Sequence, residues 1–93
     1  MELRDLLIAL RTESFNKELK RETFAFYNSM VGKSKYFPST KDVRTACGSC
    51  IQGVKNSIWK WYHYDESAPS FEELEFTGKL GIYNTPIYGI KKK

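Results

Sequence analysis

The chain has 93 residues, of which 41% are hydrophobic and 15% aromatic, so it predicts one globular domain with a modest core and excludes intrinsic disorder. No apolar run approaches the roughly 20 residues that cross a bilayer, and charges occupy the start where a signal peptide has its apolar stretch. The net charge of +4 is distributed unevenly, because residues 65–78 contain five acids and no base. We therefore expect no membrane partner and a protein that is not secreted, with a place in the cell interior.

The predicted domain, residues 1–93, has three parts. Residues 1–64 form a helical part, residues 65–78 an acidic connector, and residues 79–93 a hairpin with a lysine tail. The expected class is mainly α, with a three-helix core and a small C-terminal β-hairpin. Two cysteines, Cys47 and Cys50, are too few for a disulfide framework.

Leucines at helical spacing predict a first amphipathic helix over the first dozen residues. A second helix, capped by Thr12 or Ser14, is expected to end at Gly32; whether it continues the first helix is open. Its predicted buried stripe is Phe15, Leu19, Phe26 or Tyr27, and Met30.

The third helix has the clearest periodicity and is predicted from Ser39 to about Tyr62. Ser39 and Asp42 resemble a capping box at its start. Its buried face spans an arc of roughly 140° at 100° per residue. That face comprises Val43, Ala46, Cys47, Cys50, Ile51, Val54, Ile58 and Trp61.

After the third helix, the acidic stretch 71–76 fits either a helix or a strand. Beyond Gly78, apolar residues on both sides of Asn84-Thr85-Pro86 predict a small hairpin with a turn of three or more residues.

Cys47-Gly48-Ser49-Cys50 is the one short motif with a chemical interpretation. With His63 it supplies three ligands of a zinc site, but a fourth is missing. A redox pair normally follows a strand at the start of a helix, whereas here the preceding residues are expected to be helical. Two small buried hydrophobic residues are the favoured interpretation. We therefore expect no metal site.

The sequence contains no Gly-rich phosphate loop and no repeated metal-ligand spacing. The glutamates of the connector fit a solvated face better than a pair of catalytic carboxylates. We expect no enzymatic activity and no cofactor.

Aromatic residues after Ser57 exceed what one buried stripe needs, so part of them is expected at the surface as anchors for a protein partner. Packing in the core is the alternative for the same rings. With two tyrosines of the hairpin, the candidate binding residues are Trp59, Trp61, Tyr62, Tyr64, Tyr83 and Tyr88.

The third helix is also expected to carry a basic and polar edge, comparable to the recognition helix of a three-helix DNA-binding domain. An ordinary solvated face is the alternative. With lysines of the preceding loop, the candidate nucleic-acid residues are Lys33, Lys35, Lys41, Arg44, Gln52 and Lys55.

One block resembles small uncharacterised proteins of tailed bacteriophages. It consists of Phe26-Tyr27-Asn28, Gly32, and Thr45-Ala46-Cys47-Gly48-Ser49-Cys50, with a helix after it. The resemblance covers residues 24–55 and implies a viral accessory protein or virion component, found in the host cytoplasm or in the virion.

The leading hypothesis is thus a non-enzymatic interaction protein that binds a protein partner. The alternative is a small basic nucleic-acid-binding protein. Self-association is compatible with both.

Overall fold

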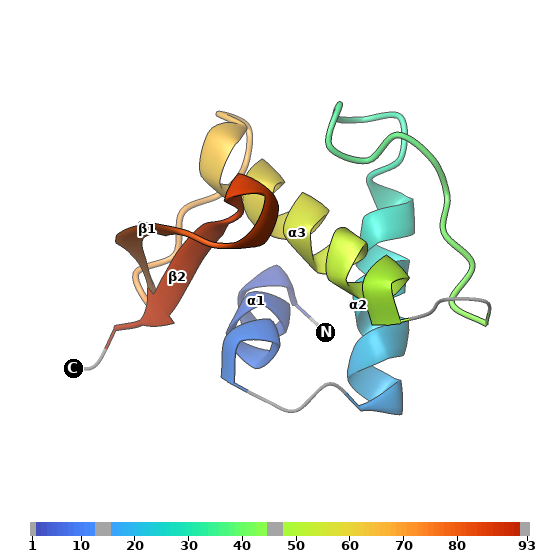
Figure 1. The fold of residues 1–93 in the computed structure, drawn as a ribbon, viewed down its shortest axis with the longest axis horizontal. Helices are drawn as coiled ribbons and strands as arrows, with labels where there is room; N and C mark the ends of the chain where they lie inside the picture. The colour runs from blue at the N-terminus through green and yellow to red at the C-terminus, as the bar shows by residue number, and fades with distance from the viewer. Residues whose placement is uncertain (1, 13–15, 45–47, 92–93) are drawn as a thin grey trace.

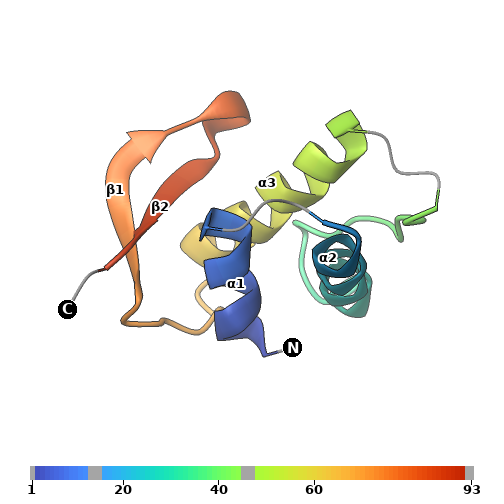
Figure 2. The same ribbon diagram turned by 90° about the horizontal axis from the view of Figure 1, so that it is seen from below.

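The computed structural model describes residues 2–12, 16–44 and 48–91. Its elements are helices α1 (Leu3–Thr12), α2 (Lys17–Ser29) and α3 (Gly48–Tyr64), strand β1 (Leu74–Leu80), the 3-10 turn η1 (Ile82–Asn84) and strand β2 (Pro86–Ile90). Three helices followed by an antiparallel hairpin confirm the predicted class. α1 lies between the hairpin and α2 (Figures 1 and 2), while α3 packs against both α2 and β2.

α1 and α2 are two separate helices. Asn16, directly before α2, is extended, and its side-chain oxygen accepts a hydrogen bond from Leu19 N at 2.8 Å. This is an N-cap, so the predicted caps are wrong. Thr12 belongs to α1, where its hydroxyl donates to the Ile8 carbonyl at 2.8 Å, whereas Ser14 and Phe15 lie outside the described residues.

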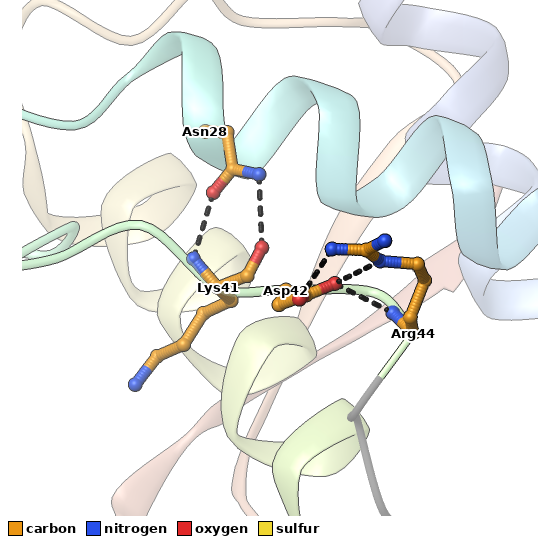
Figure 3. A network of polar contacts seen from close by, with 4 residues as sticks. All are labelled: Asn28, Lys41, Asp42 and Arg44. Atoms are coloured by element: carbon orange, nitrogen blue, oxygen red, sulfur yellow. Dashed lines mark hydrogen bonds and ion pairs between the residues drawn. The ribbon is translucent and has the colours of Figure 1, made fainter.

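The predicted start of the third helix at Ser39 is also wrong, because α3 begins at Gly48. Asp42 accepts a hydrogen bond from Arg44 N at 2.9 Å, which forms a local turn in place of a helix cap. Asn28 of α2 holds the neighbouring backbone, donating to Lys41 O at 3.0 Å and accepting from Lys41 N at 2.9 Å (Figure 3). The segment before α3 is therefore tied to α2 by its backbone.

Phe37 lies in the connection between α2 and α3 and fills the centre of the core. Its ring is fully buried. It contacts Phe26, Tyr27 and Trp61 at centroid distances of 6.2, 5.1 and 6.0 Å. Aromatic packing around one ring thus joins α2, the connection and α3.

The hairpin begins earlier in the chain than predicted. β1 starts at Leu74, so the acidic stretch that fits a helix or a strand becomes a strand in its second half. Leu74 pairs with Ile90 and Phe76 with Tyr88, but the register shifts before Leu80 pairs with Pro86. Gly78 supplies the positive φ of 83° at this bulge. The bulge separates the packed base of the hairpin from its tip.

Asp65 connects the end of α3 to the loop after α2. Its carboxylate accepts bonds from Ser67 N at 2.9 Å, the Ser67 hydroxyl at 2.7 Å and the Ser34 hydroxyl at 3.2 Å. These bonds, that of the Ser67 hydroxyl first, hold the pKa of Asp65 below its ordinary value of 3.8. The charged form is therefore the one that the fold stabilises.

We expect Asp65→Asn to lower the free energy of unfolding at neutral pH, because a neutral amide oxygen accepts weaker hydrogen bonds than a carboxylate. Because the pKa of Asp65 is lower in the folded protein than in the unfolded chain, its carboxylate stabilises the fold fully above pH 3.8. This stabilisation is lost as the pH falls through the folded-state pKa. Urea unfolding at about pH 7 and about pH 2 measures both regimes. Glu66→Gln removes the same charge from an exposed neighbour and serves as control. An equal loss at both pH values would contradict the prediction.

Candidate functional site

The aromatic run of α3 lies mostly inside the protein. Trp59, Trp61 and Tyr62 are 7%, 4% and 8% exposed, so the prediction that these rings stand at the surface is wrong. Tyr64, at the end of the helix, is 49% exposed. Packing in the core, the alternative for this run, holds for its three central rings.

The buried rings attach the hairpin to α3. Trp59 stacks on Tyr88 of β2 with centroids 5.4 Å apart, and Tyr62 stacks on Phe71 at 6.0 Å. The Tyr62 hydroxyl also accepts a hydrogen bond from Phe71 N at 3.0 Å. From α1, Arg11 Nε donates to the Tyr88 carbonyl. The base of the hairpin is therefore fixed by aromatic stacking and by one arginine.

Tyr88 is only half-buried, and its hydroxyl lies 2.7 Å from His63 Nδ1. Burial raises the pKa of this hydroxyl above its ordinary value of 10.0, so the phenol stays neutral at physiological pH. Tyr88 belongs mainly to the support of the hairpin.

The tip of the hairpin is apolar and exposed. Leu80, Ile82 and Tyr83 are 50%, 66% and 75% exposed. Of the three, only Tyr83 is among the binding residues predicted from the sequence, since those candidates were all aromatic. We call these three residues the hairpin tip.

Tyr83 adopts a left-handed backbone conformation with φ 57° and ψ 30°, and Asn84 follows at φ 60°. For a residue with a Cβ this conformation costs roughly 1–2 kcal/mol, and asparagine tolerates it better than tyrosine. The turn is closed by Gly81 N donating to Thr85 O at 2.8 Å and Thr85 N to Ile82 O at 3.1 Å. The closed turn thus holds an aromatic ring outward at a strained position.

A groove of about 180 Å³ opens beside the hairpin tip, between the end of α1 and one face of α3. Ile82, Trp59 and Tyr88 contribute to its apolar wall. The polar residues along it are Arg11, Gln52, Lys55, Asn56 and Thr85. Residues from both sets of sequence-predicted candidates therefore meet in the groove, together with Arg11, Asn56 and Thr85, which neither set contains.

The predicted basic edge does not exist as one face of a helix. Lys41 and Arg44 precede α3, and the Arg44 guanidinium bonds the Asp42 carboxylate at 3.2 Å (Figure 3). This side-chain bond lowers the pKa of Asp42 and raises that of Arg44, so each charge favours the charged state of the other.

The remaining basic candidates are also dispersed. Lys41 lines a depression beside Cys50 and Ser57, whereas Gln52 and Lys55 line the groove. At 100° per residue, Cys50 and Ser57 fall on one side of α3, and Gln52 and Lys55 fall on roughly the opposite side.

The loop lysines lie elsewhere again. Lys35 borders a third depression, which contains Tyr64, Asp65 and Glu66 at the far end of α3. Lys33 is exposed in the turn after α2. Lys35, Lys41 and the pair Gln52 and Lys55 thus border three different depressions.

The zinc ligands considered from the sequence do not converge. Cys50 is an exposed residue in the first turn of α3 and His63 is in its last turn, roughly 20 Å away at 1.5 Å per residue. Burial of Cys50 as a small hydrophobic residue is wrong, and Cys47 lies outside the described residues. Among residues 2–12, 16–44 and 48–91, no group of three His, Cys, Asp or Glu is placed to hold a metal ion.

In comparisons with known proteins, no family model matches this chain, and no curated protein or solved structure matches it either.

Proposed function

We propose that this chain is a non-enzymatic interaction protein that binds a protein partner through the hairpin tip. The observation that carries the proposal is Tyr83, a 75% exposed aromatic ring at a left-handed position. Strain at an exposed, closed turn is typical of binding and active sites, because folding alone would favour glycine or asparagine there. Aromatic side chains are also common among the residues that dominate binding energy.

The surroundings of Tyr83 support a binding surface. Leu80 and Ile82 extend the apolar area on the same turn, and the groove lies directly beside Ile82. The base of the hairpin is held by Trp59 and Arg11, so the tip is presented on a fixed support. A fixed support reduces the entropy lost on binding.

The competing proposal is nucleic-acid binding, and the dispersion of its basic residues argues against it. A sequence-tolerant binder needs several cations along one backbone. Here Lys41 and Lys55 flank opposite sides of α3, and Lys35 lies beside Asp65 and Glu66. Tight DNA binding at about 50 mM salt that collapses at about 200 mM would overturn our preference.

The setting of the proposal is a phage or virion, and it rests on the resemblance of residues 24–55 alone. Across the described ranges, no helix combines the length and the apolar character that a membrane span requires.

Photo-crosslinking at the tip tests the proposal. A benzoyl-phenylalanine at position 83, presented to host extract and to virions, should give one defined crosslinked protein that excess unmodified chain displaces. The same probe at Arg21 is the control, because Arg21 is an exposed residue of α2, and α1 lies between α2 and the hairpin (Figure 2).

Tyr83→Asn separates binding from folding. Asparagine tolerates the left-handed conformation, so the variant should keep or slightly raise the unfolding midpoint. Loss of the large ring should weaken association with the crosslinked protein by at least about 2 kcal/mol, or about 30-fold. A stable Tyr83→Asn variant with undiminished association would refute the proposal.

A further inference from the structure

The two strands of the hairpin differ in how their outer edges are protected. An unpaired strand edge offers N–H and C=O groups to another strand, and proteins usually block such edges. The outer edge of β2 is blocked, because Pro86 has no N–H group and Arg11 donates to the Tyr88 carbonyl. Helix α1 also packs against this strand. The chain therefore closes one side of its two-stranded sheet.

The outer edge of β1 has no such cover. Within the part of the chain that the structure describes, β1 pairs with β2 alone, and it lies on the side of β2 away from α1 (Figure 2). Leu74 is its one buried residue, and the other six are exposed. Lys91 N donates to Glu73 O at 2.8 Å, which fixes the alternation of the ladder. By this alternation the N–H and C=O groups of Phe76 point to the open edge.

The side chains along β1 are complementary to a second copy of the same strand. Two β1 strands can run antiparallel about a two-fold axis that passes through Thr77. The opposed pairs are then Leu74 with Leu80, Glu75 with Lys79, Phe76 with Gly78, and Thr77 with itself. Opposite charges and paired threonines stabilise neighbouring strands, and an aromatic ring covers a glycine on the strand beside it. Each opposed pair is thus a favourable one.

The two charges of β1 lie on the same face of the hairpin. Phe76 and Leu80 pair with residues of β2 that are two positions apart, so they share one face in spite of the bulge. Glu75 and Lys79, each one position earlier, face the other way. Among the described residues neither of these two side chains has an ion-pair partner. Both charges can therefore pair with a second strand.

We infer that β1 is the contact surface between two copies of this chain, which join their hairpins into one four-stranded sheet. Phe76 and Leu80, 38% and 50% exposed, lie along this edge and gain cover from the second copy. A two-fold contact uses both open edges, and the blocked β2 edges stop the assembly at a dimer. The bulge at Gly78 keeps the regular pairing short, so the dimer is weak.

This dimer is independent of the proposed function. Ile82 and Tyr83 lie beyond the paired residues and stay exposed in both copies.

Sedimentation equilibrium at concentrations from about 1 µM to about 1 mM measures the association. The unchanged chain should pass from monomer to dimer over this range and form no larger species. A chain that is still monomeric at about 1 mM would overturn the inference, and so would a series of higher oligomers.

Exchange of the two charges tests the register of the pair. Glu75→Lys or Lys79→Glu alone sets like charges opposite each other at two places, so each should weaken the dimer on the order of tenfold. Both substitutions together restore the opposite charges and the original net charge, so the double variant should dimerise like the unchanged chain. All three variants change exposed residues only and should keep the unfolding midpoint. A double variant as weak as the single ones would refute this register.

Glu66→Lys is the control for the net charge. It makes the same change in charge as Glu75→Lys, at an exposed residue outside β1. Dimerisation should be nearly unchanged, and a loss as large as that of Glu75→Lys would show that total charge governs association.

Hydrogen exchange of the Phe76 amide locates the contact. Its exchange should be slower at about 1 mM than at about 10 µM, because the second strand accepts its hydrogen bond. A dimer in which this exchange is independent of concentration would contradict the inference. So would a dimer that Ile82→Ala abolishes, since the contact would then lie at the hairpin tip. Crosslinking of position 83 to another protein does not depend on these outcomes, so the two proposals fail separately.

Discussion

Phe37→Ala should lower the free energy of unfolding by about 3–5 kcal/mol, the range expected when a fully buried phenylalanine is truncated. Phe37 is fully buried and touches Phe26, Tyr27 and Trp61 within 6.2 Å of its centroid. Truncation removes these contacts and leaves a cavity that helices fixed on both sides cannot close. Since small domains have a total stability of about 5–15 kcal/mol, the variant should be near its folding threshold.

Phe76→Ala is the matched control for this prediction. The same atoms are removed, but Phe76 is 38% exposed and lies on β1. Partial burial against His63 and Tyr88 limits its loss to about half or less of that at Phe37. Urea unfolding followed by tryptophan fluorescence measures both variants. Equal losses would show that Phe37 does not form the centre of the core.

The sequence predicted the elements better than their boundaries. The leucines of α1 and the apolar residues around the turn needed only local patterns, and the class is confirmed. The start of α3 depended on Asp42, whose side chain fits both a helix cap and a local turn. The bonds between Asn28 and the Lys41 backbone favour the turn. A hydrophobic pattern along the sequence cannot reveal that contact.

Burial on α3 was underestimated for a related reason. A helix packed on one side has one buried stripe. Because Trp59 and Tyr62 lie outside the predicted stripe, they were expected at the surface. α3 packs against α2 on one side and β2 on another, and Phe71 covers Tyr62. Three neighbours widen the buried arc beyond what a single amphipathic pattern predicts.

The groove could not be predicted from the sequence either, because it also depends on contacts between distant parts of the chain. Arg11, Lys55 and Thr85 come from the end of α1, the middle of α3 and the turn of the hairpin. Their proximity follows from the stacking of Trp59 on Tyr88, which the sequence does not specify. Tyr83 could be named as a candidate because an exposed tyrosine near a predicted turn needs no tertiary contact.

Ile58→Ala should destabilise the protein by about 2–5 kcal/mol, whereas Ile82→Ala should change its stability by less than about 0.5 kcal/mol. The two substitutions remove the same atoms. Ile58 is fully buried at the centre of α3, and Ile82 is 66% exposed at the hairpin tip. The cost of an isoleucine depends on the contacts and the cavity left behind, so burial alone separates the two outcomes.

The same pair tests how stability and binding are divided in this protein. Ile82→Ala should weaken association with the crosslinked partner while its unfolding curve matches that of the unchanged chain. Ile58→Ala, at a temperature where it remains folded, should bind with unchanged affinity, because α3 carries the hairpin without offering Ile58 to a partner. If Ile82→Ala cost as much stability as Ile58→Ala, the hairpin tip would be part of the core, and its apolar residues would need no partner to explain them.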